Sequence, residues 1–429
     1  MKKLRVHENK RHLCWEDGKP FFYMGDTAWE LFHRLNKEEI DHYMQERARQ
    51  GFTVVQAVAL AEYGGLTLEN PYGCLPLKVV NGTYDPCTPD LDGEYSYWDH
   101  VDYALDKAAE TGLLVAFLPT WGDKFNRSWG DGPEIFTPEN AYRYGLWLGE
   151  RYRDRWNLLW MLGGDRPLEQ RHRPVIDEMA RGLREGDRGN HLITFHPVGG
   201  TASNDFLNDA PYIDFHTSQT GHDVAKCYES YKEMQRMEAM CDKPFMDSEP
   251  RYEDHPACFK AEYGFYWQPE DVRHNAYWNV LQGTCGHTYG NHAIWSVTRE
   301  PNDYYPYAWD EALTHPGAEQ VAFVRKLRES RDYFSYRPDE SLVEQNNALL
   351  GHLSAGQGDG YAYIYSPQGL PFVAHLQQIN AKHLKASWFD PRTGETTAFA
   401  VVPACADTQF VPPTSGKDQD WVLILDVLA

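Results

Sequence analysis

Short apolar, β-rich segments alternate with amphipathic helical segments from residue 20 to about residue 335. This alternation indicates parallel strands joined by helices, because two parallel strands need a crossover element between them. The candidate strands are residues 20–26, 52–60, 113–121, 157–165, 191–197, 213–219, 243–249 and 284–296. Eight strands, each followed by a helix, predict an α/β fold of the (β/α)8 TIM-barrel type. The alternative is an open doubly wound sheet, which usually carries a glycine-rich loop after its first strand, whereas Thr27-Ala28-Trp29-Glu30 stands here.

Helix start and stop signals lie between the candidate strands. Asn36 and Glu39 have the spacing of a capping box, and Gly51 stands where a helix commonly ends. Thr137 followed by Pro138 is typical of an N-cap with proline in the first turn. These signals support the barrel interpretation because they place helices in the intervals between strands.

The sequence pattern changes after about Tyr336. Residues 337–429 contain few helix signals and many short alternating segments, such as 360–365 and 421–425, separated by turn residues. We expect a barrel domain over residues 1–336 and a small antiparallel β-sandwich domain over residues 337–429. Asp17-Gly18 predicts a hairpin near the N-terminus, whose strands join either the β domain or the base of the barrel.

The charge balance excludes some classes of partner. The 429 residues include 63 acidic and 41 basic side chains, for a formal net charge of −22. Such a surface repels nucleic acids and anionic membranes, so we expect neither as a partner. No apolar stretch is long enough to span a membrane, and no secretory signal follows Met1, so the expected location is cytoplasmic. The sequence does not predict the oligomeric state.

The eight cysteines are scattered and form no Cys-x-x-Cys pair. Free thiols are therefore expected rather than disulfides or a zinc site. Several histidines follow candidate strands, but none forms a His-x-x-x-His pair on a helix. Because no Gly-x-Ser-x-Gly elbow or Walker loop is present either, we expect no metal and no cofactor.

Two carboxyl groups end opposite strands of the predicted barrel. Asp165 follows the fourth strand and Glu249 follows the seventh, so both are expected at the C-terminal mouth, where barrel enzymes hold their catalytic residues. Glycoside cleavage with retention needs two carboxyl groups about 5–5.5 Å apart. The competing interpretation is that each carboxylate caps a helix or pairs with Arg166 or Arg251. Asp247 is expected to lie deeper, in a hydrogen-bonded structural role.

Polar and aromatic residues at the other strand ends are candidates for binding substrate. Trp and Tyr offer flat faces for a sugar ring, and neutral histidines can donate to hydroxyl groups. Asp26 either binds hydroxyl groups or fixes a loop, and Trp129 is a further aromatic candidate. The predicted substrate-binding set is Asp26, Trp29, Gln56, Trp121, His196, His216, Gln219, Tyr289, His292 and Trp295.

Three motifs in order resemble one known family. Residues 25–29 (Gly-Asp-Thr-Ala-Trp), 160–165 (Trp-Met-Leu-Gly-Gly-Asp) and 247–253 (Asp-Ser-Glu-Pro-Arg-Tyr-Glu) are similar to the apiosidase-like glycoside hydrolases, glycoside hydrolase family 140. The resemblance implies a barrel followed by a small β domain, with Asp165 as acid/base and Glu249 as nucleophile. The related clan of barrel glycosidases usually ends strand four in Asn-Glu, whereas Gly164-Asp165 agrees with the apiosidase-like group.

The resemblance also implies a substrate class. The family releases terminal β-linked apiose, a branched pentofuranose, from pectic side chains or flavonoid apiosides. We therefore expect a small-molecule glycoside or oligosaccharide as the substrate, and we favour small imported glycosides over polymers. Two alternatives stay open: an arabinofuranosidase-type enzyme with the same carboxylate pair, and a carbohydrate-binding barrel without catalysis.

Overall fold

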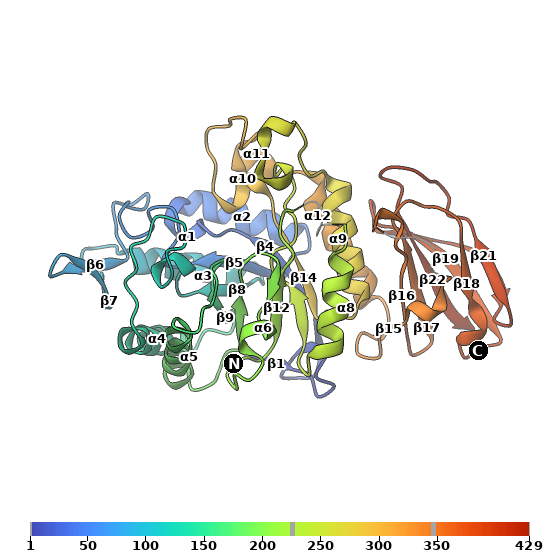
Figure 1. The fold of residues 1–429 in the computed structure, drawn as a ribbon, viewed down its shortest axis with the longest axis horizontal. Helices are drawn as coiled ribbons and strands as arrows, with labels where there is room; N and C mark the ends of the chain where they lie inside the picture. The colour runs from blue at the N-terminus through green and yellow to red at the C-terminus, as the bar shows by residue number, and fades with distance from the viewer. Residues whose placement is uncertain (1, 224–227, 345–348, 429) are drawn as a thin grey trace.

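A computed structural model describes residues 2–223, 228–344 and 349–428 (Figure 1). Its centre is a ring of parallel strands. In chain order they are β4 (Tyr23–Thr27), β5 (Val54–Val58), β8 (Leu114–Leu118), β9 (Leu158–Gly163), β10 (Ile193–His196), β12 (His216–Gln219), β13 (Phe245–Asp247) and β14 (Gly286–Tyr289). The predicted barrel is therefore confirmed, with each strand shorter than its predicted range.

The ring consists of two hydrogen-bonded ladders. One has the order β10-β9-β8-β5-β4-β14, and the other joins β12 to β13 and adds the short antiparallel strand β11 (Thr201–Ala202). Single backbone hydrogen bonds bridge the two gaps: Asp214 donates to Ile193 at 2.8 Å, and Cys285 donates to Phe245 at 3.0 Å. These bonds close the sheet on itself, so all eight strands present their C-terminal ends at one mouth.

Helices cover the outside of the ring. The longer ones are α2 (Lys37–Arg49), α3 (Tyr97–Glu110), α4 (Pro138–Tyr152), α5 (Arg173–Asp187), α8 (Ser230–Met240), α9 (Pro269–Leu281) and α12 (Pro316–Glu329). Short helices are α1 (Leu31–Arg34), α6 (Asn204–Leu207), α10 (His292–Trp295) and α11 (Trp309–Ala312). The predicted capping box of Asn36 and Glu39 begins α2, and the Thr137 side chain caps α4.

The eighth predicted strand, residues 284–296, is wrong over its second half. The strand β14 ends at Tyr289, and residues 292–295 form α10. The Asn291 side chain accepts a hydrogen bond from the Ala293 amide and so caps this helix. The apolar segment therefore continues past the barrel mouth as a helix instead of extending the sheet.

Two antiparallel additions flank the barrel. The turn at Asp17-Gly18 joins β2 (Leu13–Trp15) to β3 (Pro20–Phe21), and β1 (Leu4–Val6) completes a three-stranded sheet. This sheet stands apart from the sheets of the C-terminal region. A second hairpin, β6 (Leu77–Val80) and β7 (Thr83–Pro89), lies in the connection between β5 and α3 and was not predicted.

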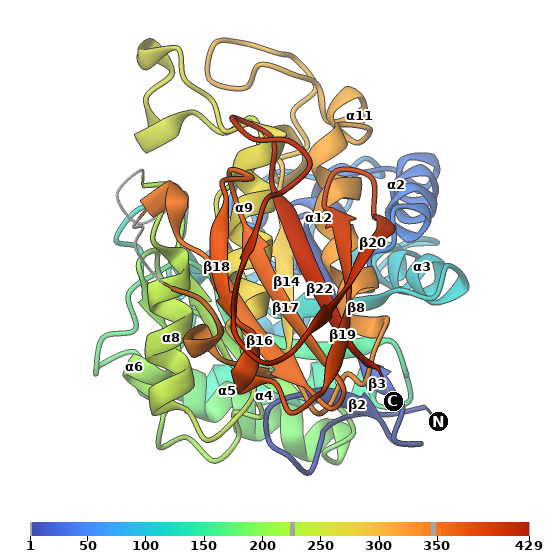
Figure 2. The same ribbon diagram turned by 90° about the vertical axis from the view of Figure 1, so that its right-hand side faces the viewer.

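The described residues from 337 to 428 form antiparallel sheets, as expected. The larger has the order β15-β16-β17-β22-β19-β20, and β18 pairs with β21 (Figure 2). The strands are β15 (Arg337–Pro338), β16 (Ser354–Gly358), β17 (Tyr361–Ser366), β18 (Phe372–His375), β19 (His383–Asp390), β20 (Glu395–Pro403), β21 (Asp407–Phe410) and β22 (Trp421–Leu428). Figure 2 shows this sheet in front of α9 and α12 of the barrel.

A buried ion pair joins this sheet to the barrel. Arg273 on α9 is fully buried, and it donates two hydrogen bonds to Asp420 from Nη2 (2.5 Å) and Nε (2.9 Å). Arg273 also donates to Asp418 at 2.6 Å. Beside it, Tyr277 of α9 stacks on Tyr365 of β17, with ring centres 5.2 Å apart. The contact is therefore fixed by charge and by aromatic packing.

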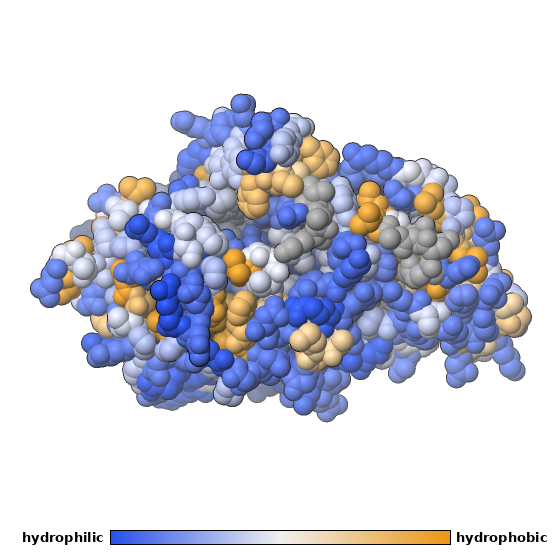
Figure 3. All heavy atoms as spheres, in the orientation of Figure 1, coloured by the Kyte–Doolittle hydropathy of each residue, from blue (hydrophilic) through white to orange (hydrophobic). Residues whose placement is uncertain are grey.

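The molecular surface is mostly hydrophilic in the orientation of Figure 3, with small separate apolar patches. Within the described ranges, no helix combines the length and apolar character needed to cross a membrane.

Replacing Arg273 with Met should destabilise the protein by about 3–5 kcal/mol, because the Asp420 carboxylate stays buried without its cation. Urea unfolding measures this loss. Arg331→Met is a matched control, since Arg331 also pairs with a residue of β22, Asp426, but in partly exposed surroundings. Arg331→Met should lower the free energy of unfolding by less than about 1 kcal/mol. Equal losses in the two variants would contradict the assigned role of burial.

Candidate active site

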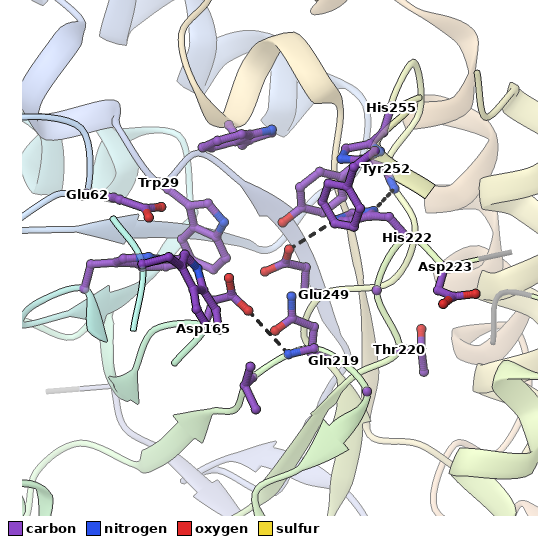
Figure 4. Close-up of a pocket in the computed structure, with 18 of the residues that line it drawn as sticks. Trp29, Glu62, Asp165, Gln219, Thr220, His222, Asp223, Glu249, Tyr252 and His255 are labelled. Atoms are coloured by element: carbon purple, nitrogen blue, oxygen red, sulfur yellow. Dashed lines mark hydrogen bonds and ion pairs between the residues drawn. The ribbon is translucent and has the colours of Figure 1, made fainter. Parts of the chain in front are cut away.

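A cavity of about 520 Å³ opens at the C-terminal mouth of the barrel (Figure 4). It is lined mainly by aromatic rings, carboxyl groups and polar side chains that follow the strands. They include Trp29, Glu62, Trp121, Trp129, Asp165, Gln219, His222, Glu249, Tyr252, His255, Phe259 and Trp295. Asp165 and Glu249, predicted from opposite strands, therefore share one cavity, and Figure 4 shows both carboxyl groups directed into it.

Glu249 is held by two histidines. His196 Nε2 lies 2.8 Å from one carboxylate oxygen, and His222 Nε2 lies 3.3 Å from the other. The Tyr252 amide donates to His222 Nδ1 at 3.4 Å, which places the His222 proton on the nitrogen that faces Glu249. Burial by itself raises the pKa of Glu249, but the bonds from His196 and His222 outweigh it and hold the pKa well below its ordinary value.

Asp165 lies on a tight turn at the end of β9. Its own φ is 48°, and the two glycines before it have φ of 90° and 117°. A Cβ on Gly164 would lie 2.8 Å from the Gly122 nitrogen and 3.0 Å from the Trp121 Cα. Only glycine lets the chain pass so close to the neighbouring loop. This turn brings the carboxyl group of Asp165 to the cavity, where 26% of its side chain is exposed.

The charge state of Asp165 differs from that of Glu249. Burial is the largest cause, and the negative charge of Glu249 is the next; together they raise the pKa of Asp165 to about 7. His196 and Arg166 oppose this shift. One carboxyl group is thus protonated near neutral pH while the other is ionised, which is the division of roles between an acid and a nucleophile.

Arg166 connects Asp165 to its surroundings. Its guanidinium donates to the Asp165 carbonyl at 2.7 Å and lies 3.4 Å from the Asp165 carboxylate. It also forms an ion pair with Glu62, a further carboxylate of the cavity wall. The arginine pairing that the sequence offered as a competing interpretation of Asp165 is therefore present, alongside the exposure of Asp165 to the cavity.

Four residues of the predicted substrate-binding set line the cavity: Trp29, Trp121, Gln219 and Trp295. Two of them carry buried polar atoms that have no hydrogen-bond partner within the described part of the chain. These atoms are Trp121 Nε1, a donor, and Gln219 Oε1, an acceptor. Buried polar atoms are normally satisfied, so both are free to bond a polar ligand.

The other six predicted residues do not line the cavity. His196 is buried and contacts the Glu249 carboxylate through its Nε2. Asp26 is fully buried in an ion pair with Arg47 at 2.6 Å, so it fixes structure instead of contacting substrate. The remaining four are buried and bonded within the protein or packed beneath the wall: Gln56 with Tyr23, His216 with Ser203, Tyr289 with Glu253, and His292 with Trp295.

Asp247 has the structural role that was expected. It is buried and accepts hydrogen bonds from Thr220 Oγ1 at 2.6 Å and Asn279 Nδ2 at 3.0 Å. The Glu249 amide also donates to it at 3.3 Å. Asp247 thus fixes the backbone that carries Glu249.

Several cavity residues were missed because they lie in loops beyond the strands. His222 follows β12, while Tyr252 and His255 follow β13. His222 stacks on His255 with ring centres 4.0 Å apart. The motif 247–253 contained Tyr252, but nothing in the sequence marked His222 as a partner of Glu249. Over the described residues, no group of three or more His, Cys, Asp and Glu side chains is arranged to hold a metal ion.

Comparisons with known proteins point to one family. A family model described as "Apiosidase-like, catalytic domain" matches residues 7–335, and a model for a "collagen-binding domain of a collagenase" matches residues 338–426. None of the curated proteins compared with the sequence matches it.

Solved structures agree with the first model. One titled "Glycoside hydrolase" is 29% identical, with a TM-score of 0.89, and the match covers 99% of this chain and 97% of that one. A glycoside hydrolase family 5 protein from Bacteroides vulgatus is also 29% identical, with a TM-score of 0.90 and coverage of 99% and 93%. Since the apiosidase-like catalytic model spans well over half of the sequence, the chain belongs to the apiosidase-like family and is a glycoside hydrolase.

Proposed function

We propose that this enzyme releases a terminal pentofuranosyl residue with retention of configuration, and that the sugar is β-linked apiose. Plant-derived glycosides, either flavonoid apiosides or pectic oligosaccharides, are the proposed substrates, and membership of glycoside hydrolase family 140 is part of the proposal. One observation carries the proposed chemistry: Asp165 and Glu249 share a cavity, and the pKa of Asp165 is raised while that of Glu249 is lowered. The match to the apiosidase-like catalytic model supports the choice of sugar.

The proposed mechanism is a double displacement. Glu249 attacks the anomeric carbon, the bond to the leaving oxygen breaks, and Asp165 gives that oxygen a proton. Water then attacks the glycosyl-enzyme, Asp165 takes a proton from it, and the bond to Glu249 breaks. His196 and His222 support the first step because their hydrogen bonds keep Glu249 ionised.

The proposed sugar contacts follow from the cavity wall. Trp29, Trp121 and Trp295 supply aromatic surface beside the carboxyl pair. The free Nε1 of Trp121 and the free Oε1 of Gln219 match the acceptor and donor capacities of sugar hydroxyl groups. We assign the catalytic domain to residues 1–336 and propose that the β domain, residues 337–429, braces α9 and α12.

Removing either carboxyl group should abolish efficient turnover. We expect Glu249→Ala to be inactive on every glycoside. Asp165→Ala should lose about 10²–10⁴-fold for an alkyl leaving group and less for nitrophenolate, which departs without a proton. Initial rates measure both effects. Glu253→Gln is the matched control, since Glu253 is buried with a pKa raised to about 7 but does not line the cavity. Normal turnover by Glu249→Ala would contradict its role.

The rate should depend on pH through both carboxyl groups. Asp165 acts as an acid, so kcat/KM should fall by about tenfold per pH unit above its raised pKa of about 7. The acid limb should lie below the ordinary range of a glutamate, because the pKa of Glu249 is lowered. Steady-state kinetics between pH 3 and 9, a range chosen to contain the basic limb, measures this profile, and the rate should stay level toward its acid end. In Asp165→Ala with a nitrophenyl glycoside, the basic limb should disappear. A wild-type rate that stays constant through pH 9 would refute the assignment.

The released sugar should be apiose in its original anomeric configuration. The measurement is proton NMR of reactions with a panel of apiosides, arabinofuranosides and pyranosides, recorded before the product mutarotates. Release of arabinose would instead favour the arabinofuranosidase alternative. An inverted first product would rule out the double displacement.

A further inference from the structure

An exposed tryptophan, Trp129, lies at the cavity mouth close to Asp165. Trp129 lines the same cavity as Asp165, and 45% of its surface is exposed. The Arg166 guanidinium lies 4.3 Å from the centre of its ring. The same guanidinium donates to the Asp165 carbonyl at 2.7 Å. Arg166 therefore contacts both the Trp129 ring and the proposed acid.

The protein holds this ring in place. Arg166 Nε donates to the Trp129 carbonyl at 3.0 Å. Gly130, with φ of 94°, packs so tightly that a Cβ would lie 2.6 Å from Arg166. The Gly132 amide donates to buried Asp123 at 2.7 Å. These bonds tie the backbone around Trp129 to buried charged groups, and the cation–π contact with Arg166 holds the ring at the mouth.

We propose that Trp129 forms a leaving-group subsite, which stacks on a ring attached directly to the scissile oxygen. This inference rests on the proposed function, because an acid that protonates the leaving oxygen must lie beside the leaving group. Arg166 makes a cation–π contact with the indole, and the exposed 45% of the Trp129 surface is available to a ligand ring. The ligand ring is either an aryl group or a second sugar, since both present a flat face to indole.

A second exposed aromatic residue provides the comparison. Phe259 lines the same cavity with 56% of its surface exposed. Its ring lies 5.5 Å from that of His222, which contacts Glu249. Phe259 is therefore associated with the nucleophile, as Trp129 is with the acid. Because the leaving group is expected beside Asp165, it should contact Trp129 and not Phe259.

The experiment compares wild type, Trp129→Ala, Trp129→Phe and Phe259→Ala on three glycosides of the same sugar. These are a phenyl glycoside, a disaccharide and the methyl glycoside, whose leaving group has no ring. Trp129→Ala should lower kcat/KM about three- to tenfold for the two substrates with a ring and leave the methyl glycoside unaffected. Trp129→Phe should restore most of the loss, and Phe259→Ala should affect all three alike. If kcat/KM falls only for the phenyl glycoside, the subsite binds an aryl ring; if it falls only for the disaccharide, the subsite binds a sugar.

An equal loss on all three substrates would overturn the subsite. So would a shift of the basic limb of the pH profile in Trp129→Ala, because it would show that Trp129 acts on Asp165 through Arg166. If wild type cleaves none of the glycosides, the proposed function is wrong. The subsite is then tested separately, by calorimetric binding of the same three compounds. Weaker binding of the ring-bearing glycosides to Trp129→Ala supports the subsite, and unchanged binding refutes it.

Discussion

Two carboxyl groups enclosed in one cavity cannot both be ionised without a large electrostatic cost, and the site depends on how that conflict is resolved. The protein resolves it asymmetrically. His196 and His222 stabilise the charge on Glu249, and that charge, together with burial, keeps the proton on Asp165. The state of each carboxyl group therefore depends on its partner, and the two histidines decide which of them is ionised.

The β domain reaches this site through one helix. Arg273 of α9 binds Asp420, and Asn279 of the same helix donates to Asp247. Asp247 in turn accepts from the amide of Glu249. A continuous set of buried bonds thus runs from the β domain to Glu249. The helix α9 lies between the barrel and the sheet and is buried along nearly its whole length.

Strand ends were the predictable part of the site. Parallel strands must bring their carboxyl ends together, so the order of elements along the chain was enough to place Asp165 and Glu249 at one mouth. Loop residues follow no such rule. His222 lies in the loop after β12, and no sequence pattern predicts that this loop brings it to Glu249. The sequence could not choose between the two roles considered for Asp26, for a different reason. Its partner Arg47 lies on α2, and sequence patterns do not show which charges pair across a core.

The glycines before Asp165 also limit how the site can evolve. Related barrel glycosidases usually carry asparagine where this chain has Gly164. Here any side chain at that position would meet the Gly122 nitrogen and the Trp121 Cα, on a backbone whose φ of 117° already disfavours it. Asparagine therefore cannot replace Gly164 without movement of the neighbouring loop. The two kinds of strand end are therefore separated by a steric barrier, and lineages that carry one are expected to keep it.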